Sequence, residues 1–254
     1  MSRSYSFLSR SLLALLISAT LFSCEKDDDN NDQDQDTVDS TTAVQTYPTP
    51  ADADAVLVAV RANTTTDTPI GPIDIQIGTA VAIRSDDGFI TGTFVPMGQV
   101  LCNTQALTQN PNNSYVFSDI SPTSPMGISF SSEVDWSVSG GNGFDAIDYD
   151  AFVFGFPTTQ AITSEAIVNR SLGYTLSCSG VSGADSVLFN IGNVMKTLSG
   201  SSTSYTFTAD ELSALGAGSG VAQISAYTTD AVDFADQKVY FINQDTRSLT
   251  VTIE

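Results

Sequence analysis

Short runs of alternating apolar and polar residues dominate the chain after residue 50. The run AVLVAVR at 55–61 is apolar at every position but the last, which predicts a strand buried on both faces at the centre of a sheet. Other runs alternate strictly and predict strands with one buried face. Their inward positions in the first half are Ile73, Ile75 and Ile77, then Val134, Trp136 and Val138, then Phe152, Phe154 and Phe156.

The second half continues this alternation, with Gly, Ser, Thr and Asn between the runs. One helical turn is expected at 208–211, because Thr208 and Glu211 have the spacing of a capping box. Turn signals between about seven short runs are typical of a β-sandwich. The inward positions are Tyr174, Leu176 and Cys178; Val187, Phe189 and Ile191; Tyr205 and Phe207; Val239 and Phe241; and Leu249, Val251 and Ile253.

The segment at 204–227, SYTFTADELSALGAGSGVAQISAY, resembles the corner of a fibronectin type III or immunoglobulin-like domain, where a leucine-bearing loop joins two strands. The Cys…Trp…Cys arrangement of antibody domains is absent. We therefore expect an all-β protein with tandem β-sandwich domains. The first, at 51–160, is sandwich-like, and the second, at 161–254, is immunoglobulin- or fibronectin III-like.

The N-terminus has a different pattern. Arg3 and Arg10 precede SLLALLISATLF at 11–22, which carries no charge. As a helix this run rises about 18 Å, well short of the roughly 30 Å that a membrane-spanning helix must cross. A basic start, a short apolar core and small residues near its end predict a signal peptide at 1–23.

The apolar run ends in LFSC, and Leu21 through Cys24 resemble the lipobox of bacterial lipoproteins. The resemblance implies that the Cys24 thiol is acylated with palmitate-type chains and becomes the new N-terminus. Stable membrane anchoring requires more than one acyl chain, which such a cysteine supplies. The alternative is a secreted protein in which Cys24 has no anchoring role.

An acidic block, CEKDDDNNDQDQD, follows at 24–36. It resembles the surface-export signal of Bacteroidota lipoproteins, which implies that Lys26, Asp27, Asp28 and Asp29 direct the protein to the outer face of the outer membrane. Because like charges repel, we expect residues 24–50 to form a disordered, solvated tether. The alternative is that the acids act as a spacer without any sorting role.

The whole chain is strongly acidic, with 9 Lys and Arg against 29 Asp and Glu and a net charge of −20 at pH 7. Such a surface repels phosphate, so nucleic acid and anionic lipid are poor partners, and we expect no nucleic-acid binding. Three Asp-Ser or Asp-Thr tripeptides also resemble the short O-glycosylation motif of the same bacteria. They predict modification at Thr37, Ser40 and Ser186.

The chain contains no histidine, which removes Ser-His-Asp and Cys-His catalysis and most zinc sites. A carbohydrate hydrolase that uses two carboxylates is a distant alternative. The loop at 140–152, GGNGFDAIDYDAF, places Asp145, Asp148 and Asp150 near glycines, and such oxygen ligands suit calcium. This loop could equally be solvated and bind no metal.

Two cysteines remain after Cys24, and an exported protein is free to form disulfides. Cys102 and Cys178 each share a strand face with apolar residues, and we expect two buried thiols in separate cores. Trp136 is expected in the core, although with Tyr149 it could instead form a sugar-binding platform. The favoured function is a surface-anchored module that binds a glycan or a protein, without catalysis. The alternative is an accessory subunit of an outer-membrane complex with no soluble ligand.

Overall fold

The computed structural model describes residues 52–68, 71–87, 93–117, 125–131 and 133–254. All of them belong to one compact unit, Val44–Glu254. Nearly every regular element is a strand, which confirms the predicted all-β class. No helix in this part of the chain is long and apolar enough to span a bilayer.

The largest sheet has the strand order β14-β13-β16-β17-β1-β2-β6-β5, and β10 also pairs with β17. All of its pairings are antiparallel except those of β17 with β1 and with β10. Its strands are β1 (Ala55–Thr68), β2 (Gly71–Arg84), β5 (Thr108–Gln109), β6 (Tyr115–Val116), β10 (Ile167–Val168), β13 (Ser186–Ile191), β14 (Val194–Ser199), β16 (Gly218–Phe234) and β17 (Gln237–Ile253).

Three smaller sheets pack against the large one. A four-stranded sheet has the order β4-β3-β7-β8, and two pairs are formed by β11 with β15 and by β9 with β12. The elements are β3 (Val100–Cys102), β4 (Gln105–Ala106), β7 (Asp135–Val138), β8 (Ile147–Asp150), η3 (Ala151–Phe154), β9 (Thr158–Thr159), β11 (Tyr174–Ser177), β12 (Val181–Ser182), β15 (Ser204–Phe207) and α3 (Ala209–Leu212).

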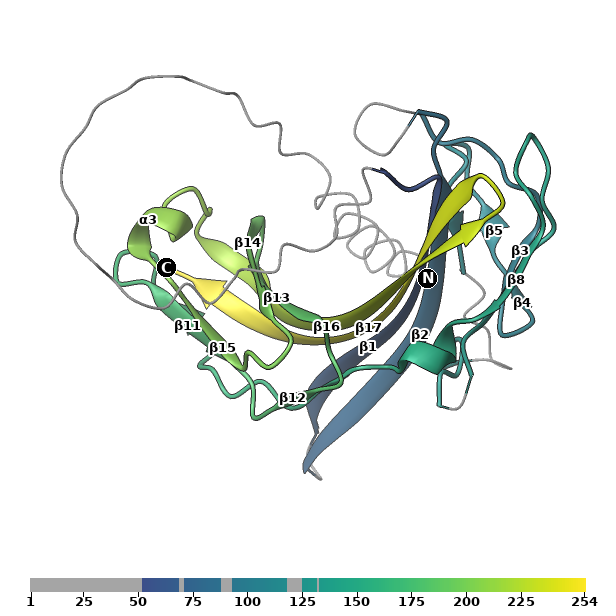
Figure 1. Ribbon diagram of the computed structural model, residues 1–254. Helices are drawn as coiled ribbons and strands as arrows, with labels where there is room; N and C mark the ends of the chain where they lie inside the picture. Colours follow the sequence, from purple (N-terminus) through teal and green to yellow (C-terminus); the bar gives the residue numbers. More distant parts are fainter. Residues whose placement is uncertain (1–51, 69–70, 88–92, 118–124, 132) are drawn as a thin grey trace, which may run out of the picture. The chain divides into compact units, whose positions relative to one another are not determined.

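Figure 1 shows the long strands β16, β17 and β1 bent into an arc. The four-stranded sheet lies on the outer side of the arc at one end, and β11 and β15 lie on the outer side at the other end. Each end encloses a hydrophobic core. The first core contains Trp136, Met97 and Phe241, and the second contains Phe189, Phe207 and Ile224.

One face of β17 contributes to both cores in succession. Val239 and Phe241 belong to the first core, and Val251 and Ile253 belong to the second. The first core combines residues of the expected 51–160 domain with Val239 and Phe241 of the expected 161–254 domain, whereas the second core lies within 161–254. The two segments also share a single sheet, because β1 of the first pairs with β17 of the second and β2 pairs with β1.

Most predicted strands are present, with two differences. The strand predicted at 55–61 is central as expected, since β1 lies between β17 and β2. The runs around Val239 and Leu249 belong to one strand of 17 residues rather than two. The strand predicted at 152–156 is wrong, because that segment begins with the 3-10 helix η3, capped by the Asp150 carboxylate that accepts from the Phe152 N–H.

Two smaller expectations are confirmed. The helical turn α3 carries the predicted capping box, in which Thr208 and Glu211 each accept a hydrogen bond from the other's backbone N–H. Cys102 and Cys178 are free, buried thiols, and they lie in different cores. Burial raises the pKa of both thiols, so neither is a reactive thiolate at neutral pH.

Candidate functional site

An acidic depression of about 570 Å³ lies on the four-stranded sheet. Strand alternation creates it, because Trp136 and Val138 of β7 point into the first core while Asp135 and Ser137 point outward. The depression is lined by Leu101, Thr104, Asp135, Ser137, Asp148 and Asp150, among others. Among the described residues, its lining contains three carboxylates and no lysine or arginine.

The register between β7 and β8 sets two of these carboxylates against each other. Asp135 lies directly opposite Asp150, and Ser137 lies opposite Asp148. Like charges that face each other across an antiparallel pair destabilise the sheet. The repulsion between Asp135 and Asp150 therefore lowers the stability of the folded chain at the depression.

The three carboxylates differ in their partners. Asp150 accepts a hydrogen bond from the Phe152 N–H at 2.8 Å and so caps η3. Within the described residues, no hydrogen bond or ion pair involves the carboxylate of Asp135 or Asp148. Both residues are exposed, so their oxygens are open to a ligand.

The aromatic residues near the depression do not form a platform. Trp136 is 1% exposed and belongs to the first core, as expected. Tyr149 stacks on Phe241 with 4.1 Å between ring centroids, and its hydroxyl donates to Asp230. The alternative of a sugar-binding surface made by Trp136 and Tyr149 is therefore not supported by this geometry.

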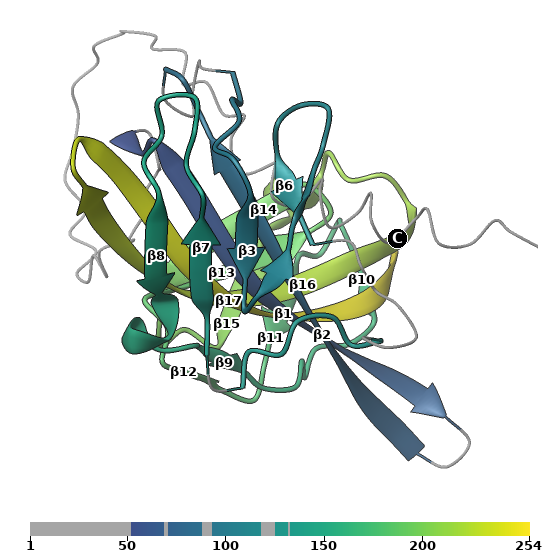
Figure 2. The same ribbon diagram turned by 90° about the vertical axis from the view of Figure 1, so that its right-hand side faces the viewer.

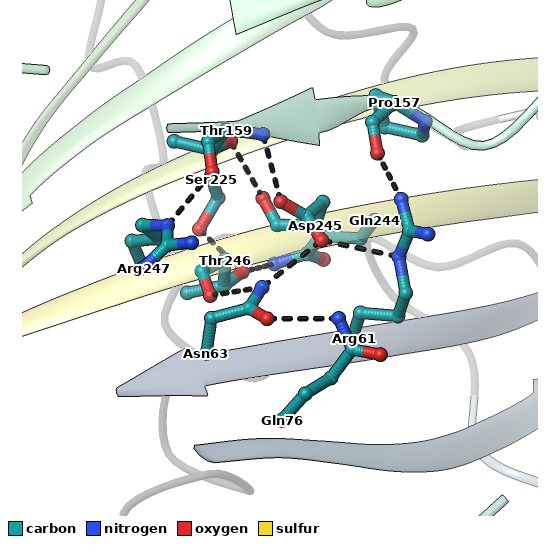
Figure 3. Close-up of polar contacts among 10 residues, drawn as sticks. All are labelled: Arg61, Asn63, Gln76, Pro157, Thr159, Ser225, Gln244, Asp245, Thr246 and Arg247. Atoms are coloured by element: carbon teal, nitrogen blue, oxygen red, sulfur yellow. Dashed lines mark hydrogen bonds and ion pairs between the residues drawn. The ribbon is translucent and has the colours of Figure 1, made fainter. Parts of the chain in front are cut away.

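A second polar cluster lies between the two cores, where the segment 155–159 crosses the face of β17 (Figure 3). Asp245 is 2% exposed and pairs with the Arg61 guanidinium at 3.1 Å. Its carboxylate also accepts from the Thr159 N–H at 2.7 Å and from Asn63 Nδ2 at 3.0 Å. The Arg61 guanidinium donates to the Pro157 carbonyl as well.

Burial dominates the electrostatics of this cluster. It raises the pKa of the Asp245 carboxyl above its ordinary value, although Thr159, Arg61 and Asn63 act in the opposite direction. Burial likewise lowers the pKa of Arg61, which Asp245 partly offsets. Because every charged oxygen of Asp245 has a protein partner, the cluster fastens the crossing segment to the sheet and has no oxygen left for a ligand.

The predicted calcium ligands do not converge. Asp148 and Asp150 point to the same side of β8, but Asp145 lies before the strand, where its N–H donates to Gln237 Oε1 at 3.0 Å. Within the described ranges, no three His, Cys, Asp or Glu side chains are grouped closely enough to hold a metal ion. The residue that joins Asp148 and Asp150 in the depression is Asp135 instead.

The remaining predicted site residues fall into two groups. Ser186 is 2% exposed on β13, and a buried hydroxyl cannot carry a glycan in the folded chain, which corrects the prediction at this residue. The others lie outside the described residues: Cys24, Lys26, Asp27, Asp28, Asp29, Thr37 and Ser40.

No protein-family model matches this chain, and no curated protein matches it either. The acidic depression therefore has to be interpreted from its own chemistry. Sequence reasoning did not single out Asp135, because its position opposite Asp150 depends on the β7–β8 register. A usable signal was present, since Asp135 alternates with the buried Val134 and Trp136 and so must face outward.

Proposed function

We propose that this protein is a surface-anchored binding module that uses the acidic depression to bind a basic segment of a protein partner. The observation that carries this proposal is the Asp135–Asp150 opposition beside Asp148, in a lining whose described residues include no cation. A lysine or arginine side chain placed there would offset the repulsion and receive charge-assisted hydrogen bonds.

The rest of the molecule supports a cationic partner over a glycan. The net charge of −20 attracts positively charged ligands over a distance and accelerates their association. Glycan sites usually offer an exposed aromatic ring, whereas Trp136 is buried and Tyr149 is stacked on Phe241. A two-carboxylate hydrolase is disfavoured because Asp135 and Asp148 are exposed, whereas a general acid that works near neutral pH is usually desolvated.

The accessory-subunit alternative calls for a large apolar patch on the surface. Six large apolar side chains of the described residues are exposed: Ile73, Met126, Val153, Ile167, Leu172 and Val221. We favour the binding module because the opposed carboxylates of the depression call for a ligand of opposite charge. We also propose that residues 161–254 are related to immunoglobulin-like or fibronectin III-like domains. Leu212 and Leu215, in the 204–227 segment that resembles the corner of such domains, are buried in the second core.

Calorimetric titration of the purified full chain with a hexalysine peptide tests the proposed ligand class. The Asp135→Asn/Asp148→Asn variant should bind the peptide about tenfold more weakly than wild type. The matched control is Glu165→Gln/Asp236→Asn, which removes the same charge from two exposed positions outside the depression. If both variants weaken binding equally, the depression is not the binding surface.

The anchor is proposed from Cys24 and the residues after it. Cys24→Ser should abolish labelling by radioactive palmitate and release the protein from the membrane fraction. Replacement of Asp27, Asp28 and Asp29 with alanine should keep the label but protect the protein from protease added to intact cells. Unchanged membrane binding of Cys24→Ser would contradict the anchor, and unchanged proteolysis would reduce the acidic block to a spacer.

A further inference from the structure

The hairpin of β1 and β2 extends beyond the sheet that contains its base. The two strands pair along their whole length, from Ala55 with Arg84 to Thr68 with Gly71. The neighbouring β17 pairs with β1 only as far as Thr64. In Figure 2 the outer part of this hairpin projects away from the other strands. We call residues 65–68 and 71–77 the arm.

On the outer edge of the arm, the pairing of β2 with other described strands stops at Gly78. On that side, β6 pairs only with Val81 and Ala82, and Gly78 forms a bridge with Gly127. From Ile73 to Ile77, no strand within the described residues lies beside β2 on its outer edge. Unpaired edges of this kind accept a further strand, and natural sheets usually protect them.

The sequence of this edge is self-complementary. It reads Ile-Asp-Ile-Gln-Ile from Ile73 to Ile77 and is symmetric in its apolar positions about Ile75. When two such edges pair antiparallel around a two-fold axis at Ile75, each Ile73 faces an Ile77 of the other copy. Each Asp74 then faces a Gln76, so no two carboxylates are opposed.

We propose that two copies of this chain associate through their arms, with β2 pairing antiparallel to β2 about Ile75. A two-fold contact joins the same surface of both copies, and this edge suits that arrangement. All three isoleucines lie on one face of the strand, and Ile73 is 44% exposed. Pairing would bury that apolar row and use the open backbone edge, independently of the acidic depression.

The net charge of the chain makes this association depend on salt concentration. Two chains of −20 repel each other, and salt screens that repulsion. We therefore expect sedimentation equilibrium of the full chain to show a dimer whose population grows as salt is raised. Ile75→Lys places two cations at the axis and should leave a monomer at every salt concentration. In the control Thr64→Lys, the same charge lies directly across the hairpin from Ile75, on β1, which is not part of the contact. This variant should still dimerise.

A disulfide test measures the register of the two paired β2 strands. It uses the full chain with Cys24→Ser, so that the remaining native thiols, Cys102 and Cys178, are buried. In Ile75→Cys the two sulfurs face each other across the axis, with Cα atoms about 5 Å apart, within disulfide reach. In Ile77→Cys the equivalent atoms are offset by four residues, about 13 Å, which is too far. Oxidation should therefore link Ile75→Cys at least about tenfold more than Ile77→Cys. Equal linking of the two variants, or a wild type that stays monomeric in high salt, would overturn the proposal.

Discussion

Asp245 is the residue on which the connection between the two cores depends. It is an ionisable group, 2% exposed, between the apolar ends of β17, and it holds the crossing segment through the Thr159 N–H. Arg61 supplies the opposite charge at 3.1 Å and also lies over the Phe156 ring. Removing one partner of such a pair costs far more than the net value of the pair, because the other charge stays buried.

Arg61→Met should therefore lower the free energy of unfolding by about 3–5 kcal/mol at pH 7. Methionine keeps the apolar contact with Phe156 but leaves the Asp245 carboxylate without its ion pair. Lys238→Met is the matched control, because its pair with Asp52 is exposed and its loss should change stability little. Urea unfolding of both variants measures the difference. Equal costs would show that the Arg61 pair contributes no more than a surface contact.

The cost of Arg61→Met should also depend on pH. Burial raises the pKa of Asp245 in the folded chain above its ordinary 3.8, so the folded state binds the proton more tightly than the unfolded state. The contribution of this group to stability is thus present below pH 3.8 and is lost as pH rises through the raised pKa. Acidification toward pH 4 should shrink the deficit of the variant relative to wild type. A deficit that grows in acid would contradict the raised pKa.

The opposed carboxylates of the depression should cost stability when no ligand is bound. Asp135→Asn removes the charge opposite Asp150 and should raise the free energy of unfolding by about 0.2–1 kcal/mol. High salt should reduce this gain. Asp236→Asn, at an exposed turn, is expected to change nothing measurable. A loss of stability in Asp135→Asn would mean that this carboxylate serves the fold and not a ligand.

At the scale of elements, alternation identified the buried face of β7, β11 and β13 but not of the arm, where Ile73 was expected to face inward and is 44% exposed. The positions of Trp136, Leu176 and Phe189 were predicted to be inward, and all three are buried. Alternation failed at 152–156, because it does not register that the Asp150 carboxylate caps a 3-10 turn there. It also divided β17, because Asn243 and Asp245 interrupt the apolar face with polar residues, which are buried through contacts with residues 151–159 and, for Asp245, with Arg61 and Asn63.

The turn α3 is the element whose local sequence specifies it most directly. The Thr208 hydroxyl accepts from the Glu211 N–H at 3.2 Å, and the Glu211 carboxylate accepts from the Thr208 N–H at 2.8 Å. Thr208→Ala should lower the free energy of unfolding by about 1 kcal/mol. Thr208→Ser keeps the capping oxygen and is expected to retain most of that stability. A similar loss in both variants would mean that the threonine methyl group, and not the cap, is responsible.

At the scale of the whole molecule, the sequence predicted two cores but not their connection. The chain does contain two apolar clusters, but the first combines residues of 51–160 with Val239 and Phe241 of 161–254. The parallel pairing of β1 with β17 joins residues that are 184 positions apart, as at Ala55 and Val239, and no local pattern reports such a contact. The acidic depression could not be predicted from the sequence either, because the opposition of Asp135 and Asp150 depends on the register between β7 and β8.

The proposed function depends on where a cationic ligand contacts this strongly acidic molecule. Carbodiimide coupling answers that directly, because it joins a carboxylate to a lysine amine only where the two groups touch. Treatment of the full chain and hexalysine with carbodiimide, followed by peptide mass spectrometry, should place the coupled lysines on Asp135 and Asp148. The exposed acids Glu165 and Asp236 serve as internal references. Coupling spread evenly over all four residues would contradict a specific site at the depression.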